Sequence, residues 1–226
     1  MDKISVLVAD DHRIVAEGLR RLLEPTYELV AIAENGREMV AAAIKLKPDV
    51  IVVDISMPLL NGIDAVSEIR NAGVQAKIIY LTMHVEANYA RRALATGASA
   101  YILKHSASSE LLFAIQEALA GRHFISPTIA EIINNTRTPE DVSLDALDGL
   151  TIRQREVLQL LAEGKSAKEV STVLEISRRT VEYHKYRIMK ILGLHKSAEL
   201  IQFAVQHGLV LQSLIPHSRS QQLKNR

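Results

Sequence analysis

The chain has 226 residues, of which 48% are apolar and 23% charged, so its composition is that of a folded globular protein rather than a disordered one. It contains no cysteine, which excludes a disulfide framework, a thiolate zinc site and a cysteine nucleophile. No apolar run approaches the roughly 18 residues of a membrane span, and the first residues start a strand-like segment rather than a signal peptide. We therefore predict a cytoplasmic protein that has no membrane partner.

The formal net charge of +1 conceals an uneven distribution along the chain. The net charge is −2 over residues 1–125, −4 over residues 126–150 and +7 over residues 151–226. A basic C-terminal segment after an acidic connector is typical of a chain whose C-terminal part binds a polyanion. Charge alone leaves open the alternative, a basic surface that is merely solvated.

The first 125 residues alternate short apolar runs with stretches of helical spacing. The runs are continuous and rich in Val and Ile, which suits strands buried on both faces of a parallel sheet. They are Ile4–Ala9, Leu29–Ala33, Val50–Val53, Ile78–Leu81 and Ala100–Leu103. The first helical stretch is marked by Ile14, Leu19 and Leu22, and four more follow. The pattern predicts a doubly wound α/β fold, (βα)5, with right-handed crossovers.

Polar residues stand directly after four of the five predicted strands. Asp10 and Asp11 follow the first, Asp54 the third, Thr82 the fourth and Lys104 the fifth. The carboxyl ends of parallel strands lie along one edge, where open α/β folds place their ligand sites. Carboxylates gathered there repel each other unless a cation neutralises them, and their oxygens favour a hard divalent ion such as Mg²⁺. With a lysine and a hydroxyl facing the same spot, this edge can accept a phosphoryl group.

A connector separates this segment from the rest of the chain. Ser126-Pro127 starts a helical stretch from Ile129 to Ile133, and residues 137–149 are polar and acidic with few large apolar groups. This composition predicts a flexible linker between two independently folding units.

Four helices are predicted after the linker from their capping signals. The expected caps are Thr151 with Gln154, Ser166 with Glu169, Ser177 and Ser197, and the last two helices are expected to end at Gly193 and Gly208. The second and third helices are joined by the short turn Glu175–Ser177, and the third helix is basic. This arrangement is typical of a helix-turn-helix.

The third of these helices has two distinct faces. Val181, His184 and Ile188 fall on one stripe together with Leu192 and are expected to face the small core, so His184 is interpreted as a packed histidine rather than a ligand. Another face carries two tyrosines among basic side chains, which suits binding in a DNA major groove. Its residues are Arg179, Tyr183, Tyr186 and Lys190.

The strand-end residues give the first segment a resemblance to a response-regulator receiver domain. The segments that carry it are Val8–His12, Val52–Pro58 followed by Asn61-Gly62, Tyr80–Thr82 and Tyr101–Lys104. The resemblance implies a flavodoxin-like receiver with Asp54 as its phosphoacceptor. It also implies a Mg²⁺ (or Mn²⁺) ion. Asp54, Asp11 and the backbone carbonyl of Ser56 would bind this ion, Asp11 directly. Asp10 would bind it through a water molecule or lie just outside its ligands.

The same resemblance implies a switch. Thr82 and Lys104 would contact the phosphoryl group, and Tyr101 would turn inward when Thr82 moves. The change is expected to alter the surface of the fourth helix, fifth strand and fifth helix. Ser56 and His84, two residues after the acceptor and the threonine, are expected to tune the lifetime of the phosphoryl group, and a solvated-loop role is the alternative.

The last part of the chain resembles a DNA-binding domain of the LuxR/FixJ/NarL type. The segments that carry the resemblance are Leu150–Leu158, Ala162–Val170, Thr180–His184 and Lys190–Leu194. The residues assigned to DNA binding are Lys165, Ser177, Arg178, Arg179, Thr180, Glu182, Tyr183, Lys185, Tyr186, Arg187 and Lys190. Glu182 stands where several relatives carry lysine, which leaves the base preference open, since a carboxylate accepts from cytosine rather than donating to guanine.

The two resemblances predict a receiver domain over 1–125, a helical and acidic linker over 126–148, a LuxR-type helix-turn-helix domain over 149–211 and a polar tail over 212–226. The implied function is that of a two-component transcription regulator that is not an enzyme. A sensor histidine kinase would phosphorylate Asp54, and the protein would bind double-stranded DNA as a homodimer.

Two alternative functions compete with this one. One is a phosphorylation-independent DNA-binding regulator whose receiver serves as a dimerisation scaffold. The other is a phosphatase with an aspartyl-phosphate intermediate, which would want a second acid two residues after its nucleophile. The chain has Ser56 there, which argues against the phosphatase.

Overall fold

The computed structural model describes residues 3–85, 87–135, 147, 149–207 and 209–210. The chain divides into two compact units, Met1–Ser143 and Leu144–Arg226, which we call the first and the second unit. Most of the predicted acidic linker, the predicted helix end at Gly208 and the predicted tail over 212–226 lie outside the described residues.

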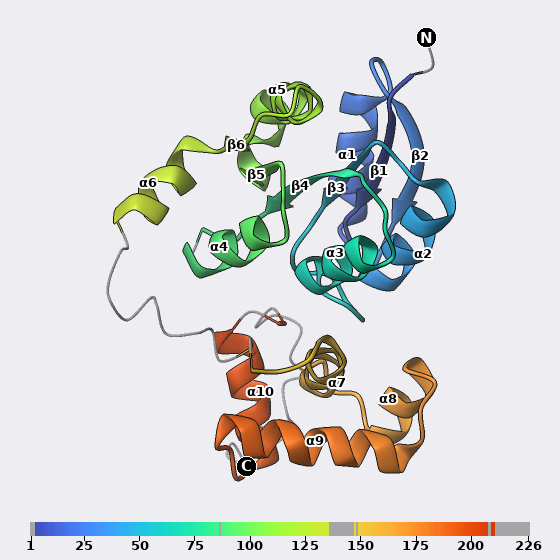
Figure 1. Cartoon of the computed structure of the whole chain (residues 1–226), viewed down its shortest axis with the longest axis vertical. Coiled ribbons are helices and arrows are strands. Elements are labelled where there is room, and N and C mark those ends of the chain that lie inside the picture. Colours follow the sequence, from blue (N-terminus) through green and yellow to red (C-terminus); the bar gives the residue numbers. More distant parts are fainter. Residues whose placement is uncertain (1–2, 86, 136–146, 148, 208, 211–226) are drawn as a thin grey trace, which may run out of the picture. The chain divides into compact units, whose positions relative to one another are not determined.

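The first unit is built on a parallel sheet with strand order β2-β1-β3-β4-β5-β6 (Figure 1). The strands are β1 Ser5–Ala9, β2 Glu28–Ala33, β3 Val50–Val53, β4 Lys77–Thr82, β5 Ala100–Leu103 and β6 Phe124–Ile125. Because β1 lies between β2 and β3, the chain reverses the direction in which it adds strands, as in a doubly wound fold. The predicted α/β fold is confirmed. The two-residue strand β6 was not predicted, because so short a run shows no periodicity.

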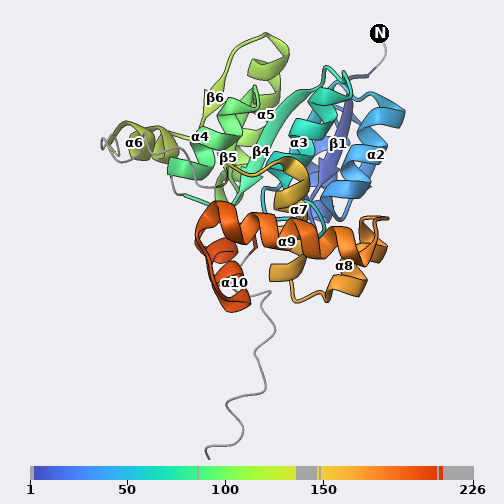
Figure 2. The same cartoon turned by 60° about the horizontal axis from the view of Figure 1, so that its bottom comes forward.

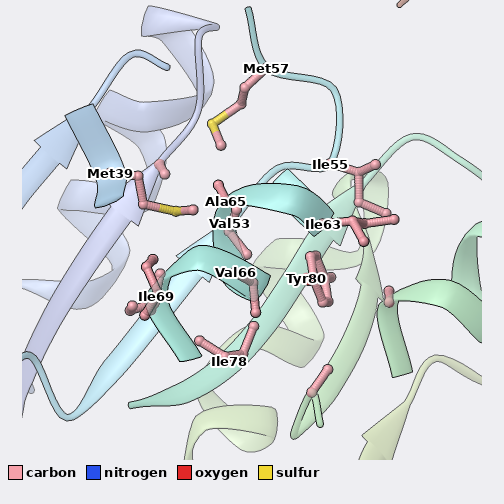
Figure 3. Close-up of a cluster of buried hydrophobic side chains, with 14 of the residues drawn as sticks. Met39, Val53, Ile55, Met57, Ile63, Ala65, Val66, Ile69, Ile78 and Tyr80 are labelled. Atoms are coloured by element: carbon pink, nitrogen blue, oxygen red, sulfur yellow. The ribbon is translucent and has the colours of Figure 1, made fainter. Parts of the chain in front are cut away.

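Helices cover both faces of this sheet. They are α1 Arg13–Leu23, α2 Gly36–Leu46, α3 Gly62–Asn71, α4 Ala87–Ala95, α5 Ala107–Leu119 and α6 Pro127–Asn135, with the short 3₁₀ helix η1 Lys104–Ser106. One buried cluster joins the sheet to α1 and α5 through Leu19, Leu23 and Leu111. The other joins it to α2, α3, α4 and α6, and Figure 3 shows Val66 and Ile69 of α3 beside Ile78 of β4 in this cluster.

The loop after β3 is held tightly against the start of α3. Asn61 caps α3 by accepting a hydrogen bond from the backbone N–H of Asp64 at 3.0 Å. A Cβ at Gly62 would lie only 2.1 Å from the backbone oxygen of Asp54, so any larger residue would displace that backbone. The Asn61-Gly62 pair therefore determines where Asp54 lies.

The described residues of the second unit form four helices, α7 Ile152–Ala162, α8 Ala167–Val173, α9 Arg178–Leu192 and α10 Ser197–Gln206. Helix α7 contacts both α9 and α10, and α8 packs on α9 (Figure 2). Val157, Val181 and Leu200 are buried between them. Among the described helices of both units, none combines the length and apolar character needed to cross a bilayer.

Three of the four predicted caps are confirmed and one is wrong. Thr151 and Ser166 begin capping boxes, and Ser177 accepts a hydrogen bond from the N–H of Thr180. Ser197, in contrast, is already the first residue of α10. At the start of α10, the Glu199 carboxylate accepts hydrogen bonds from the backbone N–H groups of His195 and Lys196, at 2.7 and 3.1 Å.

Candidate functional site

The predicted carboxylates meet at the carboxyl edge of the sheet. Asp10 and Asp54 follow the adjacent strands β1 and β3, and their side chains are almost fully buried. Asp10, Asp11, His12 and Asp54 each offer one ligand atom, and these atoms all lie within 4.8 Å of one another. So many acidic groups in so small a volume require positive charge nearby.

The ammonium group of Lys104 supplies part of that charge. Its Nζ lies 2.8 Å from Asp54 Oδ2 and 2.8 Å from Asp10 Oδ2, and only 7% of the lysine side chain is exposed. Lys104 comes from the end of β5, which β4 separates from β3. The sheet order therefore brings the lysine to the two aspartates from a distant part of the chain, where it would meet any anion attached to Asp54.

Burial and charge act in opposite directions on this pair. Burial raises the pKa of the Asp54 carboxyl, Lys104 opposes the shift, and Asp10 adds to it. Burial by itself would lower the pKa of Lys104, but the carboxylates of Asp54 and Asp10 hold that pKa above its ordinary value. The lysine therefore stays charged, and the anionic form of Asp54 depends on positive charge beside it.

The acidic cluster also fits a divalent cation. Asp10 Oδ2 and Asp11 Oδ1 are buried oxygens that accept no hydrogen bond within the described residues, although Lys104 and His12 form ion pairs with them. Carboxylate oxygens of this kind are the ligands that Mg²⁺ prefers. His12 is the one nitrogen donor of the cluster, with Nδ1 2.9 Å from Asp11 Oδ1.

The residues predicted to form a switch are joined through His84. The Thr82 hydroxyl accepts a hydrogen bond from the backbone N–H of His84 at 3.1 Å, and the Tyr101 hydroxyl donates to the His84 carbonyl at 3.1 Å. Ser56 Oγ and His84 Nε2 lie 2.6 Å apart, and the Ser56 N–H donates to Asp54 Oδ1 at 3.3 Å. The tyrosine side chain is fully buried.

His84 is the residue whose importance sequence reasoning underestimated. The sequence predicts only that His84 tunes the lifetime of the phosphoryl group, with a solvated-loop role as the alternative. The structure instead connects it to the loops after β3 and β4 and to β5. The only sequence signal was its position two residues after Thr82, because the partners of His84 are 17 and 28 residues away in the chain.

The predicted DNA-binding residues lie mainly on the exposed side of α9. Tyr183 and Tyr186 are 58% and 64% exposed, and Arg178, Arg179, Glu182, Arg187 and Lys190 are exposed as well. Thr180, Lys185 and Lys165 are half-buried, and Lys165 is 3.3 Å from Glu163. Within the described part of the chain, no arginine or lysine of α9 forms an ion pair with a carboxylate.

The turn between α8 and α9 is bound to α7 by Arg153, which also forms an ion pair within α7. Arg153 Nη1 is 2.8 Å from the buried carboxylate of Glu156, and Arg153 Nη2 donates to the Leu174 carbonyl at 2.6 Å. Leu174 ends α8, and Glu175 in the following turn has a φ of 52°. Arg153 therefore fixes the sharp turn from which α9 starts, so that the bases of α9 are presented on a rigid element.

Family models match both units. Residues 6–116 match the response regulator receiver domain, and residues 148–204 match the bacterial regulatory proteins of the luxR family. The first match contains the acidic cluster, Thr82 and Lys104, and the second contains all of α7, α8 and α9.

The chain is similar over almost its whole length to proteins of known kind. It is 35% identical over 214 residues to the transcriptional regulatory protein MctR of Rhizobium johnstonii, covering 92% of this chain and 96% of MctR. A solved structure of two RcsB dimers bound to two parallel DNAs matches with 26% identity and a TM-score of 0.57, covering 89% of this chain and 98% of that chain. RcsB from Salmonella enterica serovar Typhimurium, bound to a promoter in the presence of the phosphomimetic BeF3⁻, matches with 26% identity, a TM-score of 0.56 and the same coverage.

Proposed function

The chain belongs to the LuxR family of DNA-binding response regulators of two-component systems, and from this we propose that phosphorylation of Asp54 by a sensor histidine kinase controls its binding to double-stranded DNA. The observation that carries the proposal is the position of Lys104, 2.8 Å from both Asp54 and Asp10. A buried carboxylate that is held by a cation at an open sheet edge is suited to accept a phosphoryl group.

The transfer itself needs little chemistry from the protein. One oxygen of the Asp54 carboxylate forms a bond to phosphorus while the bond from phosphorus to the kinase histidine nitrogen breaks, and the electron pair stays on that nitrogen. Lys104 neutralises negative charge as it develops on the phosphoryl oxygens, and the Thr82 hydroxyl binds one of them. Asp54 is thus a stoichiometric acceptor and not the nucleophile of a turnover enzyme.

The acidic cluster would hold a Mg²⁺ ion through Asp10, Asp11, Asp54 and the backbone carbonyl of Ser56. A bound Mg²⁺ ion would supply the positive charge that the transferring phosphoryl group needs besides Lys104. Without a cation, the repulsion between Asp10 and Asp54 disfavours the anionic form of the acceptor, because burial and this repulsion both raise the Asp54 pKa.

The output of the protein is assigned to α9. The arginine and lysine side chains of α9 would contact DNA phosphates. Residues near the start of the helix, Arg178 to Glu182, would reach the edges of the DNA bases in the major groove. Two copies of the chain would bind paired half-sites as a homodimer. The RcsB dimers on DNA support this arrangement by similarity.

Intact mass tests the acceptor. The full chain is incubated with Mg²⁺ and acetyl phosphate, as are Asp54→Ala and the control Glu28→Gln, which changes an exposed acid at the start of β2. We expect one added phosphoryl group on the wild type and on Glu28→Gln, and none on Asp54→Ala. An adduct that persists in Asp54→Ala would remove Asp54 from its role.

DNA affinity tests control by the acceptor. Duplexes are first selected from a randomised pool by the beryllofluoride-treated protein and then titrated with treated and untreated protein. We expect tighter binding by the treated wild type and no difference for Asp54→Ala. Equal affinities of a wild type that demonstrably carries the phosphoryl group would favour the phosphorylation-independent regulator.

A further inference from the structure

The first unit has a cavity at the edge of the sheet opposite to the acidic cluster. Its volume is about 320 Å³, and its lining includes Lys77, Ser99 and His123, which stand at or just before the starts of β4, β5 and β6. Because these strands are parallel, they all begin at one edge and end at the other. The length of the strands, at about 3.3 Å per residue, therefore separates this cavity from Asp54.

Two cations of this cavity have no carboxylate partner within the described part of the chain. Lys77 is half-buried, and its ammonium group forms no hydrogen bond or ion pair there. The guanidinium group of Arg70 makes only two long hydrogen bonds, at 3.3 and 3.4 Å, to backbone carbonyls that lie just after the C-terminal ends of α3 and α4. Arg70 thus offsets the partial negative charge of these helix ends and keeps further N–H donors for a ligand.

Two buried hydrogen-bond donors of the same cavity are also unused. Ser99 is 8% exposed, and its hydroxyl has no partner among the described residues. The backbone N–H of Ala76, a residue that is 2% exposed, donates to no acceptor among them either. A buried polar group without a partner costs free energy, so such groups normally bind water or a ligand.

Unpaired cations beside unused N–H and O–H donors form a suitable environment for a phosphate group. A guanidinium and an ammonium group neutralise a dianion, and the planar arginine side chain matches two oxygens of a phosphate. Among the described residues that line this cavity and the one next to it, Asp49 is the one acid. Its Oδ2 already accepts from the N–H and the hydroxyl of Ser5, at 2.8 and 2.7 Å.

A second cavity continues the first one. Its volume is about 490 Å³, and it shares Gln75 and Lys77 with the cationic cavity. Much of its remaining lining is apolar and includes Ile44, Val74 and Leu119, of which Ile44 and Leu119 are exposed. An apolar group attached to the phosphate would cover these side chains, as in ligand sites that combine an apolar wall with a few polar groups.

We propose that the two cavities form a binding site for a phosphomonoester with a compact apolar body. Arg70, Lys77 and Ser99 bind the phosphate, and the body packs against Ile44 and Leu119. The site lies within the first unit and is complete in one chain. It is independent of the proposed phosphorylation of Asp54, because that reaction takes place at the opposite edge of the sheet.

Titration of the full chain with phenyl phosphate tests the site. Amide NMR spectra are recorded without divalent cations, and inorganic phosphate is titrated in parallel. We expect saturable shifts of the Gly97, Ser99 and His123 amides, and about tenfold tighter binding of phenyl phosphate than of inorganic phosphate, because the ring buries apolar area.

Three outcomes of these titrations would overturn the inference. Absence of saturable shifts at millimolar phenyl phosphate would remove the site. Equal affinities for the two probes would contradict the proposed ligand class, because no apolar body would then be bound. Shifts confined to the amides around Asp54 and Lys104 would place the probe at the phosphoacceptor edge instead.

Matched charge removals test the role of the cations. Lys77→Gln and Lys45→Gln each remove one lysine charge, but Lys45 is an exposed residue in the last turn of α2 that lines neither cavity. We expect about tenfold weaker binding of phenyl phosphate in Lys77→Gln, the typical loss for one charge-assisted hydrogen bond, and wild-type affinity in Lys45→Gln. Equal losses in both variants would show that net charge alone attracts the probe.

Ser99→Ala separates ligand binding from folding. Since the Ser99 hydroxyl has no partner among the described residues, its removal should leave the thermal unfolding temperature of the free protein unchanged. The same substitution should weaken the binding of phenyl phosphate by about tenfold, because the hydroxyl donates to a charged oxygen. Wild-type affinity in a folded Ser99→Ala protein would contradict the proposed position of the phosphate.

Discussion

His184 lies on the apolar stripe of α9, between the buried residues Val181 and Ile188. Its Nδ1 is buried and has no hydrogen-bond partner among the described residues, and its ring meets that of Tyr183 edge to face at 5.8 Å. Burial lowers the pKa of His184, and the positive charge of Arg153 acts in the same direction. The sequence-based interpretation as a packed histidine agrees with this environment.

The lowered pKa of His184 predicts that the second unit loses stability in mild acid. Below its ordinary pKa of about 6.5, the unfolded chain binds a proton that the folded unit binds less well, so the free energy of unfolding falls as the pH decreases through this range. Hydrogen exchange of the α9 amides at pH 7.5 and 5.5, each rate divided by its intrinsic rate, measures the effect.

The matched variants are His184→Gln and His195→Gln, since the His195 side chain is exposed. We expect the pH dependence to weaken in His184→Gln and to persist in His195→Gln. The opposite pattern would show that another group causes the loss of stability.

The acidic site shows what residue-scale reasoning reaches. The placement of Asp10, Asp54 and Lys104 at one edge follows from their positions after strands, because parallel strands all end there. The orientation of side chains does not follow. Ile14, one of the apolar residues that mark the first helix, is 90% exposed, and the contact between Ser56 and His84 joins two loops that no spacing connects.

At the scale of elements, helix caps provide a prediction with an internal control. Ser177 accepts from the Thr180 N–H at 3.0 Å and meets the Thr180 hydroxyl at 2.8 Å, whereas Ser197 lies inside α10. Ser177→Ala is therefore expected to lower the stability of the second unit by about 1 kcal/mol. Ser197→Ala is expected to change the stability of the second unit by no more than a few tenths of a kcal/mol.

Exchange of the α9 and α10 amides under native conditions gives both free energies. A larger loss in Ser197→Ala than in Ser177→Ala would contradict the assignment of the caps. The sequence does carry a signal that separates these two serines, because Glu199 lies three residues after Lys196 but only two after Ser197. The backbone of Lys196 is extended, so Lys196 is the N-cap and α10 begins at Ser197, one residue earlier than predicted.

Elements were predicted well where the sequence carries a clear local signal. The five longer strands follow from their continuous apolar runs and the helices α7 to α10 from their capping signals, and all of them are found where these signals place them. The strand β6 has two residues, and α6 was predicted as a helix but not as a packed one. Its partner α4 lies more than 30 residues earlier, so only the folded sheet brings the two together.

At the scale of the whole molecule, the charge distribution predicts strong salt dependence of DNA binding. Each phosphate contact should lower the logarithm of the affinity by about 0.9 per tenfold increase in salt. Arg179→Ala removes one unpaired base of α9 and is expected to reduce the slope by about 1. Arg20→Ala in α1 is the control, because Arg20 is already paired with Glu17 and Glu24.

Binding titrations between about 50 and 300 mM salt check this prediction. A slope that is flat in the wild type would show that α9 does not meet DNA phosphates. A slope that changes equally in both variants would show that overall charge, and not the face of α9, determines binding.

By itself, the sequence determined the parallel α/β fold, the basic helical rear, the acidic connector and the identity of the residues at the carboxyl edge, because each depends on local periodicity or on strand ends. Only the tertiary structure decided that Lys104 lies between Asp10 and Asp54, that His84 links Ser56 to Tyr89, and that α6 packs on α4. These contacts join residues far apart in the chain, and their geometry depends on strand order and side-chain packing, which no local pattern encodes.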